Sequence, residues 1–85
     1  MVSVYPNPSN TKISVSFFEV EDGNLSLQVL DMYGNIVSSD QFIVKKDLNT
    51  IELKIEQLPN GFYYLQLKNT DAIQETTRQV KFLKY

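Results

Sequence analysis

The chain has 85 residues, of which 42% are hydrophobic and 12% aromatic, and its formal net charge at pH 7 is −2. This length and composition indicate one folded domain that buries roughly 60–65% of its unfolded surface, rather than a disordered segment. The sequence contains no Cys, which excludes disulfides and thiolate chemistry, and no His. It has no apolar run long enough for a membrane helix. Its acidic net charge argues against a nucleic-acid partner.

The hydrophobic periodicity is two, which predicts β-strands that each bury one face. In chain order we expect strands at Val2–Tyr5, Lys12–Val20, Leu25–Leu30, Ile36–Val44, Thr50–Gln57, Phe62–Lys68 and Thr76–Lys84. The residues predicted to be buried are Ile13, Val15, Leu25, Leu27, Val29, Ile51, Leu53, Ile55, Leu65 and Leu67, with Val80 and Phe82 anchoring the last strand. Seven short strands separated by frequent turns predict an all-β fold, an immunoglobulin-like antiparallel β-sandwich.

Turn-forming residues separate the predicted strands. The segment Pro6-Asn7-Pro8 cannot enter a central strand because its prolines lack a backbone donor. Asp22-Gly23 is a tight-hairpin signal, and Gly34 and Gly61 are expected to supply a positive φ in similar turns. We expect a polar loop at 45–49 and a second loop that begins at Asn69, and residues 72–77 could form a helical turn.

Residues with catalytic or metal-binding potential are few. Glu19 and Glu21 share a strand face, as do Glu52 and Glu56, and paired carboxylates can hydrolyse glycosides. Strand alternation favours a solvated polar face for these pairs instead. The segment Asp22-Gly23-Asn24 lacks the spaced acids of a calcium loop. We therefore predict no enzymatic activity, no catalytic residue, no metal site and no cofactor.

Several aromatic side chains fall outside the expected inward faces. Phe62 and Tyr64 alternate with inward residues, and further aromatics near strand ends or on less certain faces are Tyr5, Phe18, Tyr33, Phe42 and Tyr85. Such residues can mark the binding surface of a sugar- or protein-binding sandwich. They can also lie under neighbouring loops that enlarge a thin core, which is the favoured interpretation.

Three short motifs and a basic-apolar ending follow one another along the chain. They are Tyr5-Pro6-Asn7-Pro8, Leu30-Asp31-Met32-Tyr33-Gly34-Asn35-Ile36-Val37, Leu58-Pro59-Asn60-Gly61-Phe62-Tyr63-Tyr64-Leu65-Gln66-Leu67 and Lys81-Phe82-Leu83-Lys84-Tyr85. Together, from about Ser3 to Tyr85, they resemble the C-terminal sorting domain of proteins exported by the bacterial type IX secretion system. The chain departs from the family pattern at Asn35, where Lys is common.

The resemblance implies an export signal rather than an enzyme. It implies that residues 1–85 are a single sorting domain excised from a larger secreted protein, whose cargo part precedes it and enters the periplasm first. The expected partners are the outer-membrane type IX translocon and its shuttle protein, followed by a surface sortase that removes the domain. The cargo is then released, or anchored to anionic lipopolysaccharide at the surface of a Gram-negative bacterium.

We expect the machinery to recognise the terminal strand and the motif turns. The recognition candidates are Lys81, Phe82, Leu83, Lys84, Gly34, Asn35, Gly61 and Tyr64. The structural motif residues are Tyr5, Pro6, Asn7, Pro8 and Asp31. A structural role is also favoured for Gly34 and Gly61. A terminal strand suits recognition because no later segment covers its edge, and its two lysines are expected to be exposed. The alternatives are a carbohydrate- or protein-binding accessory module of an extracellular enzyme, and a structural spacer.

Overall fold

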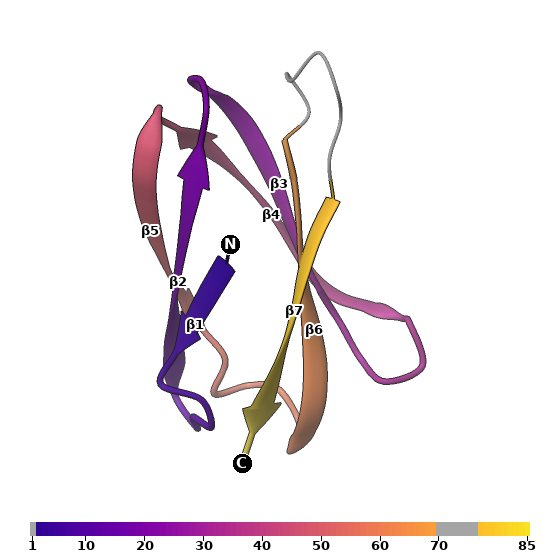
Figure 1. Cartoon of the computed structure of the whole chain (residues 1–85). Helices are drawn as coiled ribbons and strands as arrows, with labels where there is room; N and C mark the ends of the chain where they lie inside the picture. Colours follow the sequence, from indigo (N-terminus) through magenta and orange to yellow (C-terminus); the bar gives the residue numbers. More distant parts are fainter. Residues whose placement is uncertain (1, 70–76) are drawn as a thin grey trace.

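The computed structural model describes residues 2–69 and 77–85, which form seven β-strands in two antiparallel sheets (Figure 1). The strands are β1 Val2–Tyr5, β2 Lys12–Glu19, β3 Gly23–Leu30, β4 Ile36–Val44, β5 Asp47–Lys54, β6 Gly61–Asn69 and β7 Thr77–Lys84. One sheet has the order β1-β2-β5 and the other β4-β3-β6-β7. The predicted all-β sandwich is confirmed, and its immunoglobulin-like character stays a prediction. Within the described residues, no helix has the length and apolar character needed to cross a membrane.

The predicted strand positions are close to those observed except in β5. This strand begins at Asp47 and ends at Lys54, so the polar loop expected at 45–49 is wrong for its second half. Asp47 adopts a positive φ of 79°, and the Asn49 side chain accepts a hydrogen bond from the Lys45 amide at 3.0 Å and donates one to the Lys45 carbonyl at 2.7 Å. Lys45 and Lys46 are therefore the only residues between β4 and β5, and β5 begins three residues before the expected Thr50.

Two of the expected hairpins connect different sheets instead. Gly23 begins β3 after the chain crosses from β2, and Gly61 begins β6 after it crosses from β5. The hairpin expectation is wrong at both positions because a local turn signal does not specify which strands pair. The turn at Gly34 joins β3 to β4 as predicted. The second predicted loop and the helical turn lie largely outside the described residues.

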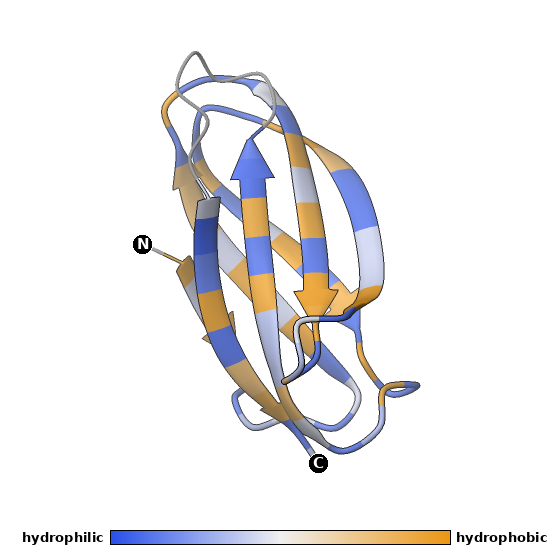
Figure 2. Ribbon diagram, turned by 90° about the vertical axis from the view of Figure 1, so that its right-hand side faces the viewer, coloured by the Kyte–Doolittle hydropathy of each residue, from blue (hydrophilic) through white to orange (hydrophobic). Residues whose placement is uncertain are grey.

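The core fills the space between the two sheets. Figure 2 shows hydrophobic and hydrophilic residues alternating along the strands, which directs one apolar face of each sheet inward. The buried hydrophobic side chains are Ile13, Val15, Phe17, Leu25, Leu27, Val29, Val44, Leu53, Ile55, Tyr63, Leu65, Leu67 and Phe82. The predicted core is therefore confirmed apart from Ile51, which is only partly buried and packs against this cluster, as does Val80.

Glu19 lies on the inward face of β2, contrary to the solvated position expected for it. It is two residues beyond the buried Phe17 and shares its face, and it is 8% exposed. Its carboxylate forms an ion pair with Arg78 and accepts a hydrogen bond from the Asn69 side chain at 2.9 Å. Arg78 also donates to the carbonyl of Phe18 at 2.9 Å. This network joins the two sheets where β2 ends and β7 begins.

Candidate recognition site

The first motif lies along the outer edge of β7. The side-chain amide of Asn7 donates to the carbonyl of Lys81 at 3.4 Å, and the Leu83 amide donates to Oδ1 of Asn7 at 3.0 Å. The amide of Ser9 donates to the Leu83 carbonyl, and the Tyr85 amide donates to the Ser9 carbonyl, both at 3.1 Å. The Asn7 side chain and the Ser9 backbone thus form the hydrogen bonds that a neighbouring strand would otherwise form with the second half of β7.

The expectation of an uncovered terminal strand is therefore wrong from Lys81 onward. The covering segment follows β1, and its Tyr5-Pro6 and Asn7-Pro8 peptide bonds are both cis. The sequence pattern excludes this segment from a central strand, but it gives no sign that a side chain in it will pair with the far end of the chain. The first motif and the ending consequently form one structural unit.

Asp31 organises the hairpin between β3 and β4. Its Oδ1 accepts hydrogen bonds from the amides of Tyr33 and Asn35, each at 2.9 Å, and its Oδ2 accepts one from the Asn35 side chain at 3.2 Å. These bonds, led by that from the Asn35 amide, hold the pKa of Asp31 below its usual value. Gly34 has a φ of +85° and donates to the Asp31 carbonyl at 3.1 Å. Asn35 therefore closes this turn with both its backbone amide and its side chain.

The third motif lies beside this hairpin and reaches the ending through Tyr63. The Tyr63 hydroxyl donates to the Pro59 carbonyl at 2.5 Å, and its ring stacks on that of Phe82 with a centroid distance of 5.6 Å. Burial raises the pKa of Tyr63, and the nearby charge of Asp31 adds to this rise. Gly61, two residues before Tyr63, has a φ of +149°. The aromatic pair thus joins the third motif to the terminal strand.

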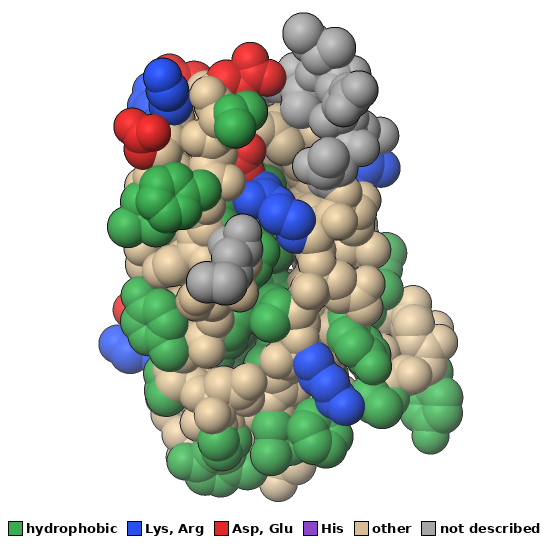
Figure 3. All heavy atoms as spheres, viewed as in Figure 1, with side chains coloured by type: hydrophobic (Ala, Val, Ile, Leu, Met, Phe, Trp, Pro, Cys, Tyr) green, Lys and Arg blue, Asp and Glu red, His purple; other side chains and the backbone are tan. Residues whose placement is uncertain are grey.

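The second and third motifs border a shallow apolar hollow of about 290 Å³. It is lined by Asp31, Met32, Tyr33, Val37, Pro59, Asn60, Gly61, Phe62 and Tyr63. Tyr33 is 91% exposed, and Met32 and Phe62 are also exposed. Figure 3 shows hydrophobic side chains both at the lower end of the molecule and on the projection at its lower right, where Figure 1 places the β3–β4 hairpin. We call these lining residues, together with Lys81 and Lys84, the motif cluster.

The two lysines of the ending differ in their surroundings. Lys81 is exposed, and its Nζ lies 4.4 Å from the centroid of the Phe62 ring, a cation–π contact. Lys84 is only 8% exposed, and its Nζ donates to Oδ1 of Asn60 at 3.3 Å. The expectation that Lys84 is an exposed charge is wrong, because the alternation that buries Phe82 places the residue two positions later on the same face.

The remaining recognition candidates contribute unequally to the surface. Phe82 is 1% exposed and belongs to the core. Tyr64 and Leu83 are half-buried, and the strand register places them opposite Lys81 and Phe62, respectively. The recognition candidates did not include Met32 or Tyr33, although apolar residues in a turn that is otherwise polar were a usable signal. In residues 2–69 and 77–85, no group of Asp, Glu, Cys or His is placed to hold a metal ion.

Comparison with models of known families gives a match to the secretion system C-terminal sorting domain over residues 3–81. The chain belongs to this family. No curated protein matches the chain. The sorting-domain family confirms the resemblance recognised from the motifs and indicates a type IX secretion signal, carried by a secreted or cell-surface bacterial protein. Sorting domains are signals of cargo proteins and are not an enzyme family.

Proposed function

We propose that the motif cluster is the surface by which the type IX translocon and its shuttle protein recognise this sorting domain. The observation that carries the proposal is that the second motif, the third motif and the ending, which lie far apart in the sequence, contribute to one exposed surface. An exposed apolar patch with a polar rim is typical of a protein-binding surface. Tyr33 and Phe62 supply aromatic anchors, and Lys81 supplies a charge with no acidic partner among the described residues.

We further propose that a cargo domain precedes this chain and that a surface sortase separates the two near or before β1. The hydrogen bonds from Asn7 and Ser9 to β7 hold the start of the sorting domain in the folded unit. Proteases cleave exposed chain whose backbone is not held by hydrogen bonds, which favours a cut ahead of β1. Cleavage releases the cargo or transfers it to a surface lipopolysaccharide.

The alternative function is that of a carbohydrate- or protein-binding accessory module. Its support lies on the outer face of the β1-β2-β5 sheet, where Phe18 is 63% exposed and hydroxyls form a hydrogen-bonded row. The Tyr5 hydroxyl lies 3.0 Å from Oγ of Ser16, which lies 3.0 Å from Oγ1 of Thr50. Titration of the domain with soluble polysaccharides tests this alternative, and saturable binding that Phe18→Ser abolishes would favour it.

The export proposal is tested by fusing residues 1–85 to a periplasmic reporter in cells with and without the type IX machinery. We expect the reporter at the surface or in the medium only when the machinery is present. Mass spectrometry of the exported reporter should show loss of the sorting domain only when the sortase is active. A reporter that stays in the periplasm of both strains contradicts the proposed function.

A further inference from the structure

The β4-β3-β6-β7 sheet has two edges that differ in their covering. Asn7 and Ser9 bind the second half of β7, as described above. No strand among the described residues pairs with the outer edge of β4, a nine-residue strand that is exposed over most of its length. An uncovered edge strand presents unpaired backbone N–H and C=O groups that can hydrogen-bond to a further strand.

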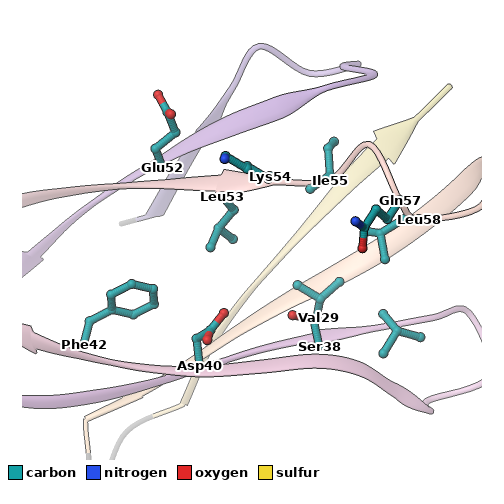
Figure 4. Close-up of a pocket in the computed structure, with 11 residues that line it drawn as sticks. Val29, Ser38, Asp40, Phe42, Glu52, Leu53, Lys54, Ile55, Gln57 and Leu58 are labelled. Carbon is teal, nitrogen blue, oxygen red and sulfur yellow. The ribbon is translucent and has the colours of Figure 1, made fainter.

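The sandwich is also open beside this edge. A groove of about 470 Å³ lies between β4 and β5, with Val29, Val37, Ser38, Asp40, Phe42, Glu52, Leu53, Lys54, Ile55, Gln57 and Leu58 as its lining. Figure 4 shows Asp40 and Phe42 directed from β4 toward Leu53 on the opposite wall. A strand added to β4 would continue the alternation of the sheet, so every second side chain would enter this groove.

One carboxylate in the groove has no neutralising partner. Asp40 is exposed, and its carboxylate forms no ion pair or hydrogen bond within the described residues. Glu52 points away from the groove in Figure 4 and lies 3.6 Å from Lys12. Lys54, on the opposite wall, makes no ion pair with Asp40. A cation carried by an incoming strand would complement the Asp40 charge.

We propose that the β4 edge and this groove bind an extended strand of a partner protein. The strand carries apolar side chains at alternate positions and a Lys or Arg opposite Asp40, and it extends the sheet by backbone hydrogen bonds. A second copy of the chain does not fit, because antiparallel pairing centred on β4 would place two Asp40 carboxylates opposite each other. This site is separate from the motif cluster, although Val37 borders both.

The test uses a capped nonapeptide, Val-Thr-Val-Thr-Lys-Thr-Val-Thr-Val, and a version with Glu in place of its Lys. Each peptide is titrated into the isotope-labelled domain while amide chemical shifts and hydrogen exchange are followed. We expect the Lys peptide to shift β4 and β5 resonances and to slow β4 amide exchange. The Glu peptide should bind at least about tenfold more weakly than the Lys peptide. Asp40→Lys should reverse this preference, whereas Glu21→Lys, which makes the same change of charge at an exposed site outside the groove lining, should retain it.

Asp40→Asn is the milder variant, and it should bind the two peptides equally. It keeps the test valid if Asp40→Lys fails to fold. The proposal is wrong if neither peptide binds, if both bind the native domain equally, or if the shifts map to the motif cluster or to β7. A dimer in sedimentation velocity, together with β4 amide shifts that depend on protein concentration, would also overturn it, since the occupant would then be a second copy of the chain.

Discussion

Single polar side chains complete the backbone hydrogen bonding of this domain where strands turn or end. Asn7 satisfies the edge of β7 with its amide, and Asp31 binds two amides of the β3–β4 hairpin with one carboxylate oxygen. Short polar side chains suit such positions because they reach nearby backbone groups with little loss of conformational entropy. The family motifs therefore contain residues that hold the backbone in place, such as Asn7 and Asp31, as well as residues whose side chains are exposed.

Gly61 should resist substitution because of its backbone conformation. A Cβ at this position would meet no atom within 4 Å, but the φ of +149° is strained for any L side chain. We expect Gly61→Ala and Gly61→Val each to lower the free energy of unfolding by roughly 1–3 kcal/mol in denaturant titration. If Gly61→Ala is neutral and only Gly61→Val is destabilising, crowding rather than φ is the cause, and this explanation is wrong.

Asp31 should make stability depend on pH. Because hydrogen bonds lower its folded pKa, its stabilising effect is complete above the unfolded pKa, about 3.9. The effect is lost as the pH falls through the folded pKa. We expect the stability difference between the native domain and Asp31→Asn to be constant from pH 7 to 5 and to shrink below pH 4. A difference that does not change down to pH 2 would contradict this role.

At the scale of elements, the ion pair between the buried Glu19 and the half-buried Arg78 connects β2 to β7. A buried charge without its partner costs roughly 3–5 kcal/mol, and Arg78→Met leaves the Glu19 carboxylate, 7% exposed, in that position. The hydrogen bond that Glu19 still accepts from the Asn69 side chain reduces the cost. We expect Arg78→Met alone to lower the free energy of unfolding by about 2–3 kcal/mol. The double variant with Glu19→Leu should recover most of this loss, and additive effects of the two substitutions would show that the pair is not coupled.

The bonds between the first motif and β7 should appear in hydrogen exchange. The Tyr85 amide is at the end of the described chain, where fraying is usual, yet it donates to the Ser9 carbonyl. We expect the amides of Leu83 and Tyr85 to be protected in the native domain. Asn7→Ala should speed exchange at Leu83 first, because its acceptor is lost, while the β3 amides keep their protection. Equal rates in the two proteins would contradict the role of Asn7.

The strand pattern and most of the core were predictable from period-two alternation, because burial of one face leaves a direct mark on the sequence. The same alternation, extended by one step, places Glu19 inward after Phe17, and Lys84 inward after Phe82. Those two positions were missed because charged residues are normally solvated. The sequence alone did not show which partners, Arg78 and Asn60, would make their burial tolerable.

Pairing across long sequence separations was not predictable. The crossings at Gly23 and Gly61 carry the same turn signals as hairpins, and only the assembled sheets decide between the two. The contact of Asn7 with β7 spans most of the chain and rests on one side chain. The motif cluster shares this property, since each of its segments looks like an ordinary turn or strand until the fold brings them together.

At the scale of the whole molecule, the proposed recognition surface draws mainly on residues outside the core, with Tyr63 belonging to both. The core between the two sheets fixes the shape, and the motif turns and the ending add a surface at one end of that shape. A sorting domain that folds independently of its cargo needs its own core. It also needs a recognition surface that does not depend on the cargo. The arrangement predicts that recognition can be removed while stability is kept.

The most direct measurement is export of the reporter fusion carrying Tyr33→Ser together with Lys81→Glu. Tyr33 is 91% exposed, and the main contact of Lys81 is with the Phe62 ring, so the loss of stability should be about 1 kcal/mol or less. The matched control is Phe18→Ser with Lys45→Glu, which replaces one exposed aromatic residue by Ser and one exposed Lys by Glu outside the motif cluster. We predict near-native melting temperatures for both variants and retention of the reporter in the periplasm only for the first. Normal export of the first variant, or equal failure of both, would contradict the motif cluster as the recognised surface.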